Sequence, residues 1–277
     1  MSYKREDIAT FILEKLKQHR EVLEKQFLES GEQIGFFYVD DLLPAELVRE
    51  IYTKFPDPGM LTLKKSIREF KHVTAQMDQY HPLLEETLYA FQDKRIVDAI
   101  SEICHINQLE PDHQLYAGGI SMMSKDHFLN PHLDNSHDKE RNRWRVLNLL
   151  YYVTQDWEES YGGNLEVWPQ GVEEAPITIV SKFNRLAVMA THQDSWHSVS
   201  RVSVDKTRCC ISNYYFSNDP LRESDRFHVT SFRGRPGEKF KDAILTLDAK
   251  ARMLVRKFFK KGIVENKHVY KKDDFNN

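Results

Sequence analysis

The stretch from Gln114 to Phe216 constrains the fold most, because it contains a long series of short candidate strands. It is rich in Tyr, Val, Ile, Thr and Trp, and Gly, Asn and Asp interrupt it at short intervals. Short segments of this composition, bounded by turn residues, are typical of strands in a sandwich or barrel. The predicted strands span residues 114–124, 128–133, 144–154, 164–168, 176–180, 185–190, 196–204 and 207–216.

Helical periodicity is found on both sides of this stretch. Apolar residues recur at helical spacing over residues 5–30, 44–55, 82–105 and 237–261, and a strand is predicted at 34–39. We expect one domain over residues 1–277, with a mainly helical N-terminal part (1–110), a β core (111–217) and a C-terminal helical extension (218–277). The last helix carries an apolar stripe made of Phe240, Ile244, Leu247, Ala251, Leu254 and Phe258.

The bulk composition limits the partners and the compartment. A net charge of −3 gives no electrostatic reason to expect nucleic acid or an acidic membrane surface as a partner. Charges recur every few residues at the start of the chain, so neither a signal peptide nor a membrane span is predicted. Cys104, Cys209 and Cys210 do not make a disulfide framework, which indicates reduced thiols and a cytoplasmic protein. The oligomeric state is left open, with a homodimer as one option.

Two His-x-Asp triplets are candidates for part of a metal site: His132-x-Asp134 and His192-x-Asp194. An Fe(II) site that activates O2 needs two histidines and one carboxylate on one face of the metal. The triplet suits this need, because residues i and i+2 of a strand point to the same side. Such triplets also arise by chance, so their surroundings have to decide between them.

The strand context favours the first triplet. Four predicted strands separate it from His197, which opens a further strand, and Arg208 follows 11 residues later. We expect the third ligand to come from a strand across the barrel, and a hairpin through residues 203–207 to place the strands of His197 and Arg208 side by side. The second triplet lies in a polar turn, and its nearest downstream companions, His228 and Arg235, lie outside the β-rich region.

His132-x-Asp134, His197 and Arg208 together resemble the ligand pattern of the Fe(II)/2-oxoglutarate-dependent dioxygenases, and most closely their prolyl 4-hydroxylase-like branch. The segment "RVLNLLYYVTQDWEESYGGNLEVW" is similar to that branch's strand, Trp, Gly-Gly and strand between the first and last ligands. The segment "FFYVDDLLPAELVREI" resembles the start of many members. The resemblance covers residues 34–217. It implies a mainly β fold, a double-stranded β-helix (jelly-roll) core packed by N-terminal and C-terminal helices.

The resemblance also implies roles for individual residues. Fe(II) would be bound by His132, Asp134 and His197, and the distal carboxylate of 2-oxoglutarate by Arg208. Tyr152 and Asn148 would support the co-substrate from a neighbouring strand, with packing in the core as the alternative for each. Cys210 would share the inward face of Arg208 and pack as a small apolar group.

The activity implied by the resemblance is hydroxylation of an unactivated C–H bond, with release of succinate and CO2. The cofactors would be Fe(II), 2-oxoglutarate and O2, with a need for ascorbate left open, as is desaturation in place of hydroxylation. A small-molecule or a carrier- or sugar-linked substrate is favoured. The alternatives are a prolyl or other residue of a cytosolic protein, and a non-catalytic metal-binding jelly roll. Arg233 and Arg235 are candidates for binding an anionic substrate, whereas a solvated loop is expected for Asn135, Ser136 and Arg143.

Overall fold

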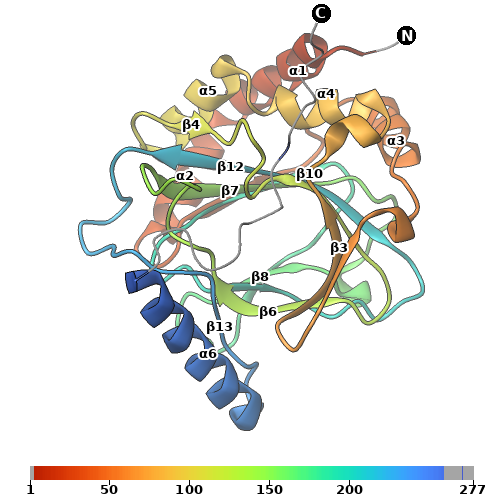
Figure 1. Cartoon of the computed structure of the whole chain (residues 1–277). Coiled ribbons are helices and arrows are strands. Elements are labelled where there is room, and N and C mark those ends of the chain that lie inside the picture. The colour runs from red at the N-terminus through yellow and green to blue at the C-terminus, as the bar shows by residue number, and fades with distance from the viewer. Residues whose placement is uncertain (1–2, 259–269, 271–277) are drawn as a thin grey trace, which may run out of the picture.

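The computed structural model describes residues 3–258 and Tyr270, and its centre is an antiparallel sheet that curls into a jelly-roll-like half-barrel (Figure 1). Among the described residues the sheet has 13 strands, in the order β1-β10-β7-β12-β5-β3-β6-β11-β8-β9, with β13 on β6, β2 on β3 and β4 on β12. The strands are β1 (Phe36–Val39), β2 (Thr62–Lys65), β3 (Glu69–Thr74), β4 (Glu110–Pro111), β5 (Gly119–Met123), β6 (Phe128–Leu133), β7 (Trp144–Tyr152), β8 (Leu165–Val167), β9 (Ile177–Ile179), β10 (Arg185–Ala190), β11 (His197–Val199), β12 (Arg208–Ser217) and β13 (Ser231–Phe232).

Helices cover the outside of this sheet. The N-terminal helices lie over the half that contains β7, β10 and β12, and the C-terminal helix lies beside β6 and β13 (Figure 1). They are α1 (Arg5–Gln18), α2 (Arg20–Gly31), α3 (Ala45–Thr53), α4 (Pro82–Ala90), α5 (Lys94–Cys104) and α6 (Lys239–Phe258), with short 3-10 turns at Pro58–Met60, Met77–Gln79 and Glu159–Tyr161. None of the helices within the described ranges is long and apolar enough to cross a membrane.

Strand β7 shows how the sequence divides the two faces of the sheet. Leu147, Leu149 and Tyr151 point outward and belong to the large core formed with the N-terminal helices. The alternating residues point into the barrel, where Tyr152 joins a second, smaller apolar cluster and Asn148 is also buried. The period of two along a strand therefore places polar groups inside the barrel and apolar groups under the helices.

The predicted fold class is confirmed, and all eight strands predicted over residues 114–216 are present as β5 to β12. The hairpin of β2 and β3 was not predicted, although β3 joins the two halves of the sheet by pairing with both β5 and β6. The helix predicted over 5–30 breaks at His19, whose backbone leaves the helical region (φ −107°, ψ 9°). The last three residues of the helix predicted over 237–261 lie outside the described residues.

The arrangement predicted for the strands of His197 and Arg208 is wrong. Strand β11 has β6 on one edge and β8 on the other, so neither edge is open for β12. Strand β12 instead pairs with β5 and β7 in the opposite half of the barrel. The connection between β11 and β12 therefore crosses from one half of the barrel to the other. It passes close to Gly162 (φ +70°), and a Cβ atom on residue 162 would lie 1.9 Å from the Arg201 carbonyl oxygen.

Much of the apolar stripe predicted for helix α6 is exposed. Phe240, Leu247 and Leu254 are 81%, 66% and 57% exposed. Leu245, on another face of the helix, is fully buried. The inner side of α6 also carries Arg252 and Arg256, which line a cavity beside the barrel mouth.

Candidate metal centre

Three side chains that can ligate a metal converge where β6 ends and β11 begins. His132 and His197 are directly opposite each other in the register of these two strands, and their ring centroids are 4.1 Å apart. Asp134 follows β6 immediately, with its carboxylate oxygens 3.6 Å from His132 Nε2 and 3.7 Å from His197 Nε2. The prediction that the third ligand comes from a strand across the barrel is therefore wrong, because His197 lies on β11, which pairs directly with β6.

Both imidazoles are held in the tautomer that a metal requires. His132 Nδ1 donates a hydrogen bond to the Asn130 carbonyl oxygen at 3.0 Å, and His197 Nδ1 donates to that of Ser195 at 2.9 Å. Each Nε2 lone pair is therefore left to point at the shared centre. Burial, together with the neighbouring His132, lowers the pKa of His197 to about 4, so this ring is neutral at pH 7.

Asp134 is ionised although it is buried. Burial by itself would raise its pKa, but His132, Arg145 and His197 together hold the pKa well below its ordinary value. Arg145 Nη1 lies 3.6 Å from Asp134 Oδ2, and its guanidinium is stacked 4.5 Å from the ring centroid of Tyr214. Oδ2 itself accepts no hydrogen bond. The site thus offers two imidazole Nε2 atoms and one carboxylate with unused acceptor capacity.

A cavity of about 120 Å³ extends from this centre into the barrel. Arg208 and Asn148 line it, and each has a buried polar atom, Nε and Oδ1 respectively, that forms no hydrogen bond. Buried polar atoms are rarely left without a partner, so these two indicate a ligand that completes them. A carboxylate fits the first and a donor group the second. Arg208 therefore suits a carboxylate of a small dianion next to a divalent metal, whereas Asn148 Oδ1 suits a water molecule or another donor.

Tyr152 and Cys210 belong to the small apolar cluster inside the barrel and are not among the residues that line this cavity. The Arg208 guanidinium carbon is 5.3 Å from the ring centroid of Tyr152, and the buried Tyr152 hydroxyl forms no hydrogen bond, so its role toward the co-substrate stays a prediction. Burial raises the pKa of Tyr152 above its ordinary value, which keeps the phenol neutral. Cys210 is fully buried in the same apolar cluster, which agrees with the prediction that it packs as a small apolar group.

The second triplet forms no such centre. His192 Nδ1 accepts a hydrogen bond from the Asp194 backbone N–H, and the Asp194 carboxylate pairs with Arg222 at 3.3 Å. Within the described ranges, His132, Asp134 and His197 are the only group of three or more His, Cys, Asp or Glu side chains whose ligand atoms lie within 4.8 Å of one another. His192 is a buried histidine of a turn.

The other candidates for substrate contacts are placed differently from expectation. Arg235 pairs with Glu166 at 2.7 Å, and Arg233 pairs with Asp242, so neither guanidinium is directed at a substrate. The loop after β6 is not simply solvated, because Ser136 is buried and exchanges hydrogen bonds with the His228 backbone. Asn135 lines a larger cavity of about 660 Å³ beside the metal centre, whereas Arg143 does not line it.

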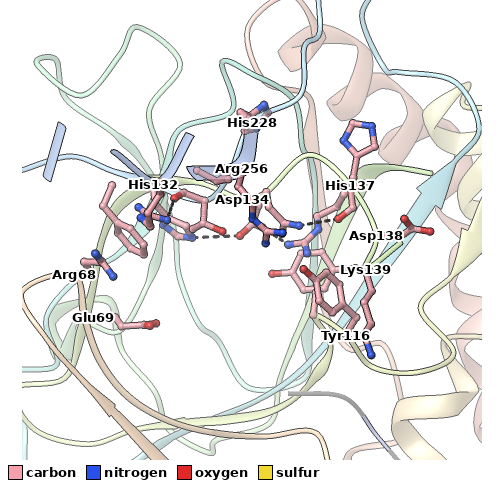
Figure 2. A pocket seen from close by; sticks show the side chains of 18 of the residues that line it. Arg68, Glu69, Tyr116, His132, Asp134, His137, Asp138, Lys139, His228 and Arg256 are labelled. Atoms are coloured by element: carbon pink, nitrogen blue, oxygen red, sulfur yellow. Dashed lines mark hydrogen bonds and ion pairs between the residues drawn. The ribbon is translucent and has the colours of Figure 1, made fainter. Parts of the chain in front are cut away.

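Sequence reasoning missed several residues of this larger cavity. Arg145, which neutralises Asp134, lies inside a predicted strand where a single arginine carries no motif. Lys139 and Arg256 come from the loop after β6 and from α6, and Figure 2 shows both among the side chains that surround the cavity. Only the three-dimensional path of these segments brings them to the metal centre.

Two histidines and one carboxylate on a jelly-roll strand pair define the class of mononuclear non-haem Fe(II) oxygenases. Residues 118–216 match the family described as the 2OG-Fe(II) oxygenase superfamily. Taken with the triad, this match identifies residues 118–216 as a 2OG-Fe(II) oxygenase core, whose cofactors are Fe(II) and 2-oxoglutarate. No curated protein sequence matches the chain significantly.

Solved structures with the same fold include prolyl hydroxylases from three organisms. A Pseudomonas putida prolyl-4-hydroxylase is 16% identical, with a TM-score of 0.53 over 70% of this chain and 98% of that one. A Phytophthora capsici prolyl 4-hydroxylase is 15% identical, with a TM-score of 0.53 over 95% of this chain and 82% of that one. A Trichoplax adhaerens prolyl hydroxylase, solved with a hypoxia inducible factor peptide fragment, is 17% identical, with a TM-score of 0.51 over 72% of this chain and 91% of that one.

Proposed function

We propose that this protein hydroxylates an unactivated C–H bond of a small-molecule or carrier- or sugar-linked substrate. His132, Asp134 and His197 would hold Fe(II), and Arg208 would bind the distal carboxylate of 2-oxoglutarate in the cavity that Asn148 also lines. The observation that carries the proposal is the convergence of the three ligand side chains at the mouth of a cavity whose lining includes an unsatisfied, buried arginine. The family match favours this enzyme over a non-catalytic binding module.

When bound, the metal and co-substrate supply the oxidation: O2 converts 2-oxoglutarate to succinate and CO2 and adds one oxygen atom to the C–H bond. The protein's own residues prepare the site for this chemistry. The carbonyl groups of Asn130 and Ser195 fix the two imidazoles, and Arg145 keeps Asp134 ionised. These contacts hold the ligand side chains in place before a metal binds, which is the kind of preorganisation that an enzyme site needs.

The volume of the neighbouring cavity supports a small-molecule substrate. About 660 Å³ lies within the range of pockets that enclose small ligands. Hydroxylation of a prolyl residue in a protein is the alternative, and the fold that this chain shares with prolyl hydroxylases does not decide between them. A screen for succinate formation with Fe(II), ascorbate and 2-oxoglutarate, using small metabolites in one arm and prolyl peptides in the other, separates the two.

Metal binding tests the ligand set directly. We expect His132→Ala to lose Fe(II) binding in an anaerobic titration and His192→Gln to retain it. The two histidines are equally buried, at 4% exposure, so they form a matched pair. Loss of Fe(II) binding in the His192 variant, with retention in the His132 variant, would reverse the assignment of the triplets. Absence of succinate formation with every substrate tested would argue against turnover.

A further inference from the structure

The cavity of about 660 Å³ is the one in which a primary substrate would meet the metal. It shares His132, Asp134 and Tyr214 with the smaller cavity that contains Arg208, so the two spaces meet at the proposed ligands. The inference below rests on the proposed function, because it takes this cavity as the substrate site. Its chemical character can then be read from the side chains that line it.

The lining of this cavity is strongly basic, although the whole chain carries a net charge of −3. Eight of the lining side chains are lysine or arginine, and three are aspartate or glutamate. Each of the three carboxylates already has a basic partner: Glu69 has Lys71, Asp134 has Arg145 and Asp138 has Arg143. Arg68 and Arg252 are in turn paired with Asp248, which lies outside this lining, so the excess of positive charge is smaller than the count of side chains.

Arg141 is the cation of this lining whose position most clearly calls for a ligand. Its guanidinium carbon lies 3.9 Å from the ring centroid of Phe227, and its Nη2 atom is buried without a hydrogen-bond partner. Within the described part of the chain, no carboxylate forms an ion pair with it. Burial and, after it, the positive charge of Arg256 lower the pKa of Arg141, and Arg256 lines the same cavity from α6.

The buried N–H of Arg141 has lost its water without gaining a hydrogen-bond partner, which costs free energy. An oxyanion bound by Arg141 would remove this cost, because arginine offers a planar fork that matches phosphate or carboxylate oxygens. The stacked Phe227 ring fixes the Arg141 fork in one orientation. We propose that the primary substrate carries an anionic head group, a phosphate or a carboxylate, and that Arg141 binds it.

Calorimetric titration of the anaerobic protein, loaded with Fe(II) and 2-oxoglutarate, tests this proposal with two probes. Glycerol 3-phosphate presents a phosphate, and 3-hydroxybutyrate presents a carboxylate. We expect at least one probe to bind, with an affinity that falls as salt is added and that drops about tenfold or more in Arg141→Gln. Arg141→Lys, which keeps the charge but loses the fork, should bind with intermediate affinity. The probe that binds more tightly identifies the head group.

Arg201→Gln is the matched control, because Arg201 is also stacked on a phenylalanine, 4.8 Å from the ring centroid of Phe128, but does not line the cavity. It should bind both probes like the wild type. Binding of neither probe by the wild type, or equal binding by the wild type and the folded Arg141→Gln variant, would overturn the proposal. Fe(II) and 2-oxoglutarate binding, measured on the same samples, tests the proposed function separately.

Discussion

Replacing Arg208 by methionine should have opposite effects on stability and on co-substrate binding. The Arg208 side chain is 3% exposed, and its Nε atom forms no hydrogen bond. In the described ranges no carboxylate pairs with it, so its positive charge is buried without compensation until a ligand arrives. Methionine fills a similar length without a charge. We therefore expect Arg208→Met to make the ligand-free protein more stable and to weaken 2-oxoglutarate binding.

The size of each effect follows from the surroundings of Arg208. A buried, uncompensated charge costs several kcal/mol, but the adjoining cavity admits water, so the expected gain in the free energy of unfolding is about 1–2 kcal/mol. An arginine that grips a carboxylate through two charge-assisted hydrogen bonds contributes about 3 kcal/mol to binding. Loss of that grip should raise the Kd for 2-oxoglutarate roughly a hundredfold.

Arg185 provides the control for this experiment, because it is also largely buried but already has its partners. Its Nε atom lies 2.5 Å from Asp40 Oδ1, and its Nη1 donates to the Val180 carbonyl oxygen. Asp40 is partly exposed, so breaking this pair should cost about 2 kcal/mol in Arg185→Met, less than for a fully buried pair. The affinity for 2-oxoglutarate should not change.

Urea unfolding of the ligand-free proteins and anaerobic calorimetry with Fe(II) and 2-oxoglutarate measure the two quantities. The reasoning is refuted if Arg208→Met is destabilised as much as Arg185→Met while its Kd for 2-oxoglutarate stays within about twofold of the wild type. That combination would show Arg208 to be a structural arginine whose charge is compensated within the fold.

Two further predictions concern the stability of the fold. Burial lowers the pKa of His192 to about 4 from its unfolded value near 6.5, so the unfolded chain binds more protons between these pH values. The contribution of His192 to the free energy of unfolding should therefore be fully present above pH 6.5 and should fall by up to about 3 kcal/mol as the pH drops to 4. In urea unfolding across this range, the free energy of unfolding of His192→Gln should fall less steeply than that of the wild type. Parallel curves for the two proteins would contradict this origin of the pH dependence. Gly162→Ala should lower the free energy of unfolding, measured by thermal unfolding, by more than about 2 kcal/mol, because residue 162 has a positive φ and the added Cβ would clash with the Arg201 carbonyl. Gly171→Ala, with φ +89° and open space around it, should lose only about 1 kcal/mol, and equal losses would show that the clash is relieved by movement of the chain.

The metal triad could be anticipated from the sequence because strands have a simple period. His132 and Asp134 follow from alternation at the end of one strand, and Arg208 and Cys210 share a face of another by the same rule. The pairing partners of those strands could not be anticipated. The β2–β3 hairpin is polar and has only one well-buried stretch, at Val73–Thr74, so its place between β5 and β6 depends on contacts far away in the sequence.

The residues on the substrate side are harder to predict, because the segments that carry them follow no period that identifies the inward face. Helix α6 illustrates this point: its apolar stripe would predict that Phe240, Leu247 and Leu254 face the barrel, yet these side chains are exposed. The opposite face is held inward by a polar anchor, in which Arg252 donates to the Thr230 carbonyl oxygen at 2.6 Å and pairs with Asp248 at 2.9 Å. A helix oriented by partly buried hydrogen bonds and ion pairs, together with the buried Leu245, can expose other apolar side chains, and the same contacts hold the basic residues of α6 at the cavity. The chemistry of the metal centre is therefore encoded in strand spacing, whereas the selection of the substrate depends on side chains that only the folded structure brings together.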